Sequence, residues 1–260
     1  MTNLTSRLKA SAFAACVHFS FSMVVAIICA AVVFGLWYPY PYRELSGGLA
    51  LFVLIVSVDV VCGPLLTSVI FNPVKPRKEL VRDLTLVALI QLAALAYGVY
   101  ALAHARPVYM VFEVDRFNVI SAIDVDEVAL AKAAKQWNTL PLWGPQVIGS
   151  REPKDADERA KSLDMSLQGV EPSMRPDWWQ NLELSSSRIL ERSKPMADLR
   201  KRHIAKPDIL QKIDAAVKDS AKAEADLRWL PLTSRRDKDW TVFLDAKTGA
   251  PVAYAAIDGF

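Results

Sequence analysis

The sequence predicts a membrane protein with three N-terminal transmembrane α-helices followed by a small α+β soluble domain. Three long apolar runs lie within the first 104 residues, at about 13–37, 48–71 and 84–102. A helix needs roughly 20 residues to cross about 30 Å of hydrocarbon, and each run reaches or comes close to that length. The rest of the chain mixes short apolar stretches with many charges. We therefore predict a membrane domain over 1–104 and a soluble α+β domain over 105–260.

Charge and cysteine content narrow the classes of function. The chain has 31 Lys and Arg and 28 Asp and Glu, of which 7 and 4 lie in 1–104, leaving 24 of each in 105–260. A soluble domain without net charge lacks the basic excess of a nucleic-acid surface, so we expect no nucleic-acid partner. All three cysteines fall in the apolar runs, and the three histidines are far apart. We therefore expect no disulfide framework, no metal site and no cofactor.

The basic residues near the apolar runs predict the topology. Arg7, Lys9 and four residues of the loop 72–83 fall on one side, whereas Arg43 and Arg106 fall on the other. Lys and Arg collect in cytoplasmic loops, which predicts a cytoplasmic N-terminus and an exported soluble domain. In a Gram-negative bacterium this would be a multi-pass inner-membrane protein with a periplasmic domain. The first run could also be a signal peptide, but it is longer than the usual 7–15-residue apolar segment, which favours an uncleaved helix.

Short patterns along the soluble domain predict mixed strands and helices. Alternating apolar residues predict strands at 108–115, 119–123, 240–244 and 251–257. Helical spacing predicts helices at about 127–137, 154–169, 187–203 and 208–227. We predict a packed loop at 170–183, where Trp178 and Trp179 are either core residues or an exposed binding pair. The two C-terminal strands form a hairpin and could pair with the strands that follow the membrane domain.

Asp59 is the most unusual residue of the apolar runs. An ionised carboxylate at the bilayer centre costs at least about 2.5–3.5 kcal/mol, so Asp59 should face the other helices. Gly63 and Pro64 follow one turn later, where proline removes a backbone hydrogen bond. His18 and Gln91 are the candidate partners; their depth of roughly 10 Å, against roughly 18 Å for Asp59, favours a contact between His18 and Gln91. Structural support, partner binding, and proton or ion chemistry all remain open for Asp59.

The residues do not form a catalytic pattern. An intramembrane aspartyl protease needs two facing carboxylates, and the other candidate, Asp83, lies at the cytoplasmic edge. The sequence shows no phosphate-binding glycine loop, nucleophile elbow or histidine-based triad. We therefore expect no enzymatic activity and no catalytic residue. In the soluble domain, Asp115, Arg116 and Phe117 follow the first predicted strand, and they form either a turn with a local ion pair or a contact surface.

An ordered set of motifs resembles a known family. The motifs are WYPYPY (37–42) and SGG (46–48), Asp59 with GPLLT (63–67), KEL (78–80) with DL (83–84), QLAALAYG (91–98), ARP (105–107) and FEVDRF (112–117). In this order they resemble the type IV pilin accessory proteins of the TfpX/TfpZ kind, which are related to FimB. The resemblance is strongest over about 35–125. It implies an inner-membrane protein that supports assembly or surface display of its cognate pilin.

The resemblance implies a type IV pilin, major or minor, and the lipid bilayer as partners, without specifying an oligomeric state. Polar groups within the bilayer would hold the pilin helix in a chaperone-like manner. The candidate partner-binding residues are Asp59, Gly63, Pro64, His18, Gln91, Trp37, Tyr38, Asp115, Arg116 and Phe117. Two alternatives are a membrane-anchored periplasmic sensor or ligand-binding module, and an intramembrane enzyme or transporter centred on Asp59.

Overall fold

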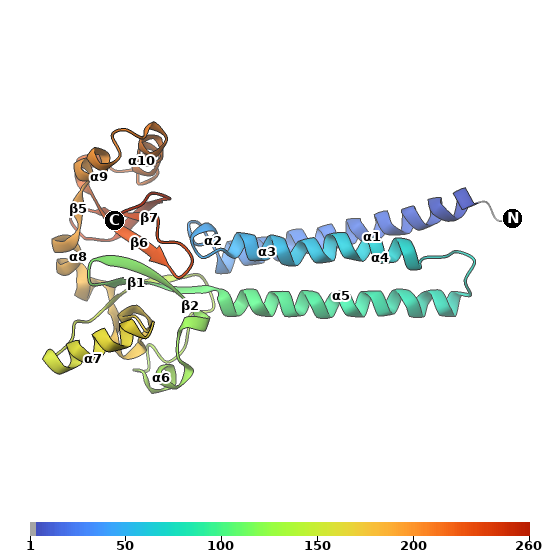
Figure 1. Cartoon of the computed structure of the whole chain (residues 1–260), viewed down its shortest axis with the longest axis horizontal. Helices are drawn as coiled ribbons and strands as arrows, with labels where there is room; N and C mark the ends of the chain where they lie inside the picture. Colours follow the sequence, from blue (N-terminus) through green and yellow to red (C-terminus); the bar gives the residue numbers. More distant parts are fainter. Residues whose placement is uncertain (1–3) are drawn as a thin grey trace. The chain divides into compact units, whose positions relative to one another are not determined.

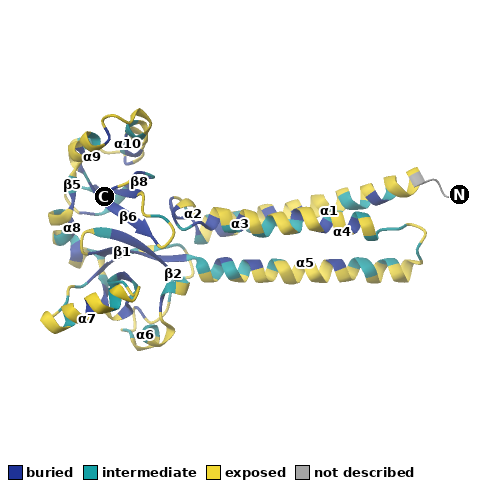
Figure 2. Ribbon diagram, in the orientation of Figure 1, coloured by how far each residue is buried: buried dark blue, intermediate teal, exposed yellow. Residues whose placement is uncertain are grey.

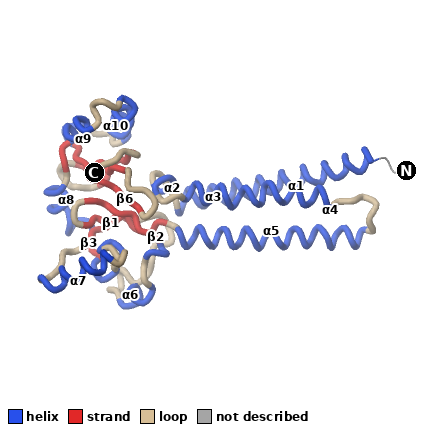
Figure 3. Tube along the Cα trace, in the orientation of Figure 1, coloured by secondary structure: helices blue, strands red, loops and turns tan. Residues whose placement is uncertain are grey.

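The computed structural model describes residues 4–260, which form two compact units (Figure 1). The membrane unit comprises the chain up to residue 36 together with 48–104, and the soluble unit comprises 37–47 together with 105–260. The strands of the described chain all belong to the soluble unit, as Figure 3 shows. Each unit is therefore described separately.

Three long helices make up the membrane unit. The first is α1 (Leu4–Val32), which continues through a π-helical turn to Trp37; the second consists of α3 (Gly48–Ser57), a π-helical turn (Val58–Cys62) and α4 (Gly63–Ile70); the third is α5 (Arg77–Ala105). The candidate membrane spans are Thr5–Trp37, Gly48–Ile70 and Arg77–Ala105. Figure 2 shows that most of the surface of these helices is exposed. Many of the exposed side chains are large and apolar. The three predicted transmembrane helices are confirmed as three long apolar helices. A helix suits a membrane span because it satisfies its backbone hydrogen bonds internally, as hydrocarbon requires.

One mixed sheet of eight strands organises the soluble unit. The strands are β1 (Pro107–Glu113), β2 (Arg116–Ser121), β3 (Gln146–Ser150), β4 (Trp179–Asn181), β5 (Lys194–Pro195), β6 (Leu227–Ser234), β7 (Trp240–Asp245) and β8 (Pro251–Ala255). Their order is β4-β3-β1-β2-β6-β7-β8, with β5 paired to β6 beside this path. The pairs β1–β3 and β2–β6 are parallel, and the other pairs are antiparallel. The C-terminal hairpin thus shares a sheet with the first strands, with β6 between them.

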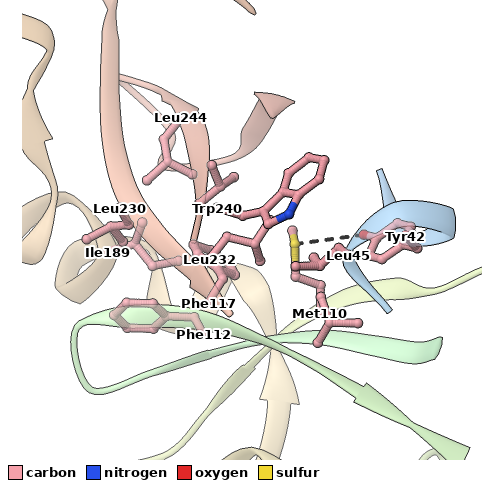
Figure 4. Packing of buried hydrophobic residues seen from close by; sticks show 12 residues of the cluster. Tyr42, Leu45, Met110, Phe112, Phe117, Ile189, Leu230, Leu232, Trp240 and Leu244 are labelled. Atoms are coloured by element: carbon pink, nitrogen blue, oxygen red, sulfur yellow. Dashed lines mark hydrogen bonds between the residues drawn. The ribbon is translucent and has the colours of Figure 1, made fainter. Parts of the chain in front are cut away.

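Helices and turns cover both faces of the sheet. The helices are α2 (Tyr42–Leu45), α6 (Glu127–Lys132), α7 (Ala156–Leu167), α8 (Ser186–Arg192), α9 (Met196–Arg202) and α10 (Pro207–Asp219). Because successive strand residues point to opposite faces, the core divides into clusters on the two sides. On one face, Phe112, Phe117 and Leu232 pack with Ile189 of α8 (Figure 4). On the other face, Trp229 and its neighbours pack under α9 and α10, and a further cluster contains Tyr109, Trp137 and Trp179.

Several predicted elements of the soluble domain were wrong in type or extent. The predicted helix 187–203 is two helices, because Pro195 has no N–H to continue α8 and begins the turn into α9. The predicted helix 208–227 ends at Asp219, since Ala221 takes a positive φ of 54°. The strands β3, β4, β5 and β6 were not predicted. The predicted loop 170–183 contains two 3₁₀ turns (Pro172–Met174 and Pro176–Trp178) and then β4.

The loop between the first two spans is part of the soluble unit. Residues 37–47 fall within the predicted membrane domain 1–104, whereas the structure groups them with 105–260. The physical reason is burial: Tyr38, Tyr42 and Leu45 are at most 5% exposed. Tyr42 and Leu45 belong to the same core cluster as Met110 and Trp240, and Figure 4 shows them beside one another. We call residues 37–47 the docked loop.

Candidate functional site

A cavity of about 240 Å³ lies within the membrane unit. All three spans line it, with the residues His18, Phe21, Ser22, Val25, Ala26, Val56, Asp59, Ala88, Gln91, Leu92 and Leu95. Three of the predicted partner-binding residues, His18, Asp59 and Gln91, therefore meet around one space. The rest of the lining is apolar except Ser22, so these polar groups dominate the chemistry of the cavity.

Asp59 lies in the π-helical turn Val58–Cys62 of the second span. Pro64, five residues later, has no N–H with which to close a π-type bond to the Asp59 carbonyl. The Gln91 side chain supplies a donor instead, with its Nε2 3.2 Å from the Asp59 carbonyl oxygen. The Oδ1 atom of the Asp59 carboxyl group is buried and has no hydrogen-bond partner among the residues described. Asp59 thus anchors one neighbouring helix through its backbone while one of its carboxyl oxygens lacks a partner.

Gly63 allows the third span to approach closely. A Cβ atom at this position would overlap the Gln91 side-chain amide, so a larger residue would displace Gln91 from the Asp59 carbonyl. Gly98 of α5 has the same role further along, because a Cβ there would overlap Ile55. Small residues of this kind let membrane helices pack at short distance. The predicted residues Gly63 and Gln91 therefore act together with Asp59.

His18 pairs with a residue that the sequence analysis missed. Its Nδ1 lies 2.6 Å from the Thr67 hydroxyl oxygen, and the expected contact between His18 and Gln91 is replaced by this one. Thr67 is only 3% exposed. The signal for it was present, because Asp59, Gly63 and Thr67 recur every four residues and so share one helix face. Near the same end of these helices, the Ser11 hydroxyl donates to the carbonyl oxygen of Ser68.

The docked loop contains two more of the predicted partner-binding residues, Trp37 and Tyr38. Trp37 is half-buried and Tyr38 is fully buried. Burial raises the pKa of the Tyr38 phenol, and the nearby Arg106 guanidinium opposes that shift. Both residues therefore act within the soluble unit.

Three further contacts fasten the docked loop. The Tyr42 hydroxyl lies 3.8 Å from the sulfur of Met110, and the Ser234 hydroxyl donates to the Leu45 carbonyl at 2.7 Å. Gly47 has a φ of +71°, and a Cβ there would overlap the side chain of Arg236. The loop is consequently held by apolar packing, by a hydrogen bond from the Ser234 side chain to its backbone, and by a turn that favours glycine.

Asp115, Arg116 and Phe117 do not share one role. Arg116 Nε lies 2.9 Å from Asp115 Oδ1 in a turn, as one of the two interpretations predicted. Phe117 is fully buried in the core cluster of one sheet face. Trp178 and Trp179 are also buried, at 2% and 5% exposure, which supports their interpretation as core residues. Within residues 4–260, no group of three His, Cys, Asp or Glu side chains is arranged to hold a metal ion.

Comparison with known proteins points to one process. Residues 3–47, which include the first span and the docked loop, match the family described as Fimbrial assembly protein FimB. The fimbrial assembly protein of serogroup I from Dichelobacter nodosus is 35% identical over 244 residues, covering 94% of this chain and 94% of that protein. The serogroup E1 protein of the same organism matches with the same identity and coverage. A protein of serogroups C1 and C2 is 45% identical over 109 residues, or 42% of this chain and 83% of its own length.

No solved structure matches the chain. The sequence relatives, in contrast, cover nearly all of it, including both units and the ordered motifs that first suggested the resemblance. The protein therefore belongs to the FimB family of fimbrial assembly proteins.

Proposed function

We propose that this protein acts in fimbrial assembly as a non-enzymatic, chaperone-like factor of the inner membrane that holds the membrane helix of a type IV pilin. The observation that carries the proposal is the cavity among the three spans, where a buried Asp59 oxygen has no partner among residues 4–260. The cavity is the place where a fourth helix could add a polar contact. The pilin would be released from this site to the growing fimbria.

The physics of hydrocarbon supports a partner at this position. A polar group buried without a hydrogen bond is costly, and lipid tails offer no donor. Helices in a bilayer associate through close packing and hydrogen bonds between helices rather than through the hydrophobic effect. A partner helix that brings a donor to Asp59 would therefore gain a contact that the bilayer cannot supply. His18 is held by Thr67, and the Gln91 amide is held by the Asp59 carbonyl, which leaves the Asp59 carboxyl group for the partner.

We further propose a cytoplasmic N-terminus and a periplasmic soluble unit. The docked loop follows the first span and packs with residues 105–260, which follow the third. Two segments that pack together lie on the same side of the membrane, as three spans require. Arg7 and Lys9 near the start of the first helix, together with the Lys and Arg residues of 72–83, support the cytoplasm for the opposite side.

Site-specific photo-crosslinking tests the proposal. A photoreactive residue at Leu92, which lines the cavity, is expected to capture the pilin in intact cells. The matched control is Leu86 on the same helix: the two are 61% and 59% exposed, but Leu86 lies about 120° around the helix from Leu92 and does not line the cavity. Capture from Leu92 and not from Leu86 supports the cavity as the contact site.

Gene deletion provides the second arm of the test. Loss of the protein is expected to reduce the number of surface fimbriae while the pilin is still made. Unchanged fimbriation together with no crosslink from Leu92 would overturn the proposal and favour a sensor or ligand-binding module. Equal capture from Leu92 and Leu86 would instead show a contact without the proposed site.

A further inference from the structure

The soluble unit contains a groove of about 1020 Å³ that the proposed function does not use. It is bounded by the ends of β1 and β3, by α7, by the C-terminal end of α8, and by the residues after β6. Its cationic lining residues are Arg116, Arg151, Arg159, Arg188, Arg192, Arg235 and Lys238, and its anionic ones are Glu113, Glu152, Glu171 and Glu191. The groove thus carries an excess of positive charge, although residues 105–260 as a whole are balanced.

Part of this positive charge is not used within the protein. Arg151 binds Glu158 at 2.7 Å, Arg235 binds Asp124 at 2.7 Å, and Arg116 and Arg188 each have a carboxylate within 4.0 Å. In the described part of the chain, three lining cations have no such ion pair: Arg159, Arg192 and Lys238. With seven cationic and four anionic lining residues, the net charge of the groove favours a ligand of negative charge.

The wall of the groove also contains a hydrogen-bond donor without an acceptor. Trp178 is 2% exposed and lies between the guanidinium groups of Arg151 and Arg175, at 4.6 and 4.0 Å from the ring centre. Its indole N–H is buried and has no acceptor among the residues described. One guanidinium nitrogen of Arg175 is likewise buried and has no acceptor among the residues described. Such groups usually have a partner, and because Trp178 lines the groove, its N–H favours an acceptor supplied from outside the chain.

The base of the groove is polar and already organised. The Asn118 amide donates to the Ser173 hydroxyl at 2.9 Å, and the Thr233 hydroxyl lies 3.2 Å from the Asn118 side-chain oxygen. Glu113 accepts the backbone N–H of Ser173 at 2.8 Å, and burial raises its pKa. These side chains are fixed by one another, so a ligand would meet a preformed surface.

We propose that this groove binds an extended acidic peptide segment of a partner polypeptide. Its volume is at the upper end of the 300–1,000 Å³ range of drug-sized sites, which is more than a single small anion fills. The exposed apolar side chains Val114 and Leu163 on its rim suit a peptide better than an inorganic ion. Carboxylates of the segment pair with Arg159, Arg192 and Lys238. This proposal does not depend on the intramembrane cavity.

Binding of defined peptides to the full-length protein in detergent tests the inference. The probe is a fluorescent decapeptide of alternating Ser and Glu, and the matched peptide has Gln in place of Glu. We expect the Glu peptide to bind at least about tenfold more tightly, and this preference to fall as NaCl is raised, because salt screens charges. The double variant Arg192→Glu/Lys238→Glu should lose about tenfold in affinity for the Glu peptide.

A matched double reversal provides the control. Lys201→Glu/Lys206→Glu changes the net charge by the same amount, but Lys201 lies in the last turn of α9 and Lys206 precedes α10, outside the groove. This variant should change the affinity by less than about twofold. Circular dichroism verifies that each variant is folded.

Three outcomes would overturn the inference. The first is equal binding of the Glu and Gln peptides, and the second is an equal loss of affinity in both double variants. The third is full displacement of the Glu peptide by inorganic phosphate or by anionic lipid vesicles at the same concentration of charge, which would assign the groove to a simple anion or a membrane surface.

Discussion

The two units of this protein are stabilised in opposite ways. In the soluble unit, apolar side chains form the interior and polar side chains form the surface, with three buried clusters on one sheet. In the membrane unit, apolar side chains such as Phe13, Val69 and Leu92 are exposed, and the contacts that join the helices include polar ones. Because the bilayer is itself apolar, burial there contributes little and specificity depends on a few hydrogen bonds and small residues. A single polar group is therefore informative in the membrane unit.

The largest expected effect comes from shortening a buried side chain of the docked loop. Leu45→Ala should destabilise the soluble unit by about 2–5 kcal/mol, because Leu45 is fully buried in its core. The measurement is thermal or denaturant unfolding of the purified protein, followed by tryptophan fluorescence. Leu49→Ala, in the adjoining membrane span where Leu49 is 44% exposed, is the control and should have little effect. Equal effects would show that the loop does not belong to the soluble unit.

A smaller effect is expected at Gly63. Gly63→Ala should cost about 1 kcal/mol, since its methyl group displaces the Gln91 amide from the Asp59 carbonyl. Gly35→Ala is the control, because nothing lies within 4 Å of a Cβ there. The effect of Gly63→Ala should largely disappear in a Gln91→Ala background. If it persists there, the overlap with Gln91 is not its cause.

The pair of His18 and Thr67 should contribute still less. A double-mutant cycle of His18→Ala and Thr67→Val should give a coupling of about 0.6 kcal/mol, the average for hydrogen bonds between membrane helices. Unfolding in mixed detergent micelles measures it. A coupling near zero would mean that the hydroxyl and the imidazole do not stabilise the bundle together.

The smallest effect on stability, and a clear effect on function, is expected at Asp59. Asp59→Ala should not lower the stability of the membrane unit by more than about 0.5 kcal/mol, because the Oδ1 atom that it removes has no partner among residues 4–260. Surface fimbriae should nevertheless decrease, and Asp59→Asn should be milder if hydrogen bonding rather than charge is used. The measurement is a fimbriae count beside protein abundance. Normal counts in both variants would remove Asp59 from the mechanism.

Local sequence patterns predicted the membrane unit better than the soluble one. Three apolar runs are sufficient to predict three spans, because length and hydropathy alone decide whether a helix crosses a bilayer. The strand β6 was missed because Pro231 lacks a ladder donor, and such a residue argues against a central strand. Pairing with β2 and β7 on both sides overrides that local signal. Long-range pairing of this kind leaves no trace in a short window of sequence.

The same reasoning explains what was predicted at the candidate site. Asp59 and Gln91 stand out because polar residues in apolar runs are rare, and both line the cavity. The predicted pairing of His18 with Gln91 was wrong and Thr67 was missed, because the partner of a side chain depends on how the helices are rotated against one another. The burial of Tyr38 and Tyr42 was not predicted, because an aromatic residue near the end of a membrane span has the same appearance in sequence whether it faces the membrane interface or a soluble core.

The docked loop has a consequence for the timing of synthesis. Leu45 and Ser234, whose hydrogen bond helps to fasten the loop, are 189 residues apart in the chain. At a translation rate of about 5–20 residues per second, the ribosome needs roughly 10–40 s to make the residues between them. During that interval the core cluster that Tyr42 and Leu45 enter is incomplete, since its members on β6 and β7 are made last. The loop is thus the first part of the soluble unit to be synthesised, and it cannot reach its final packing until nearly the whole chain has been made.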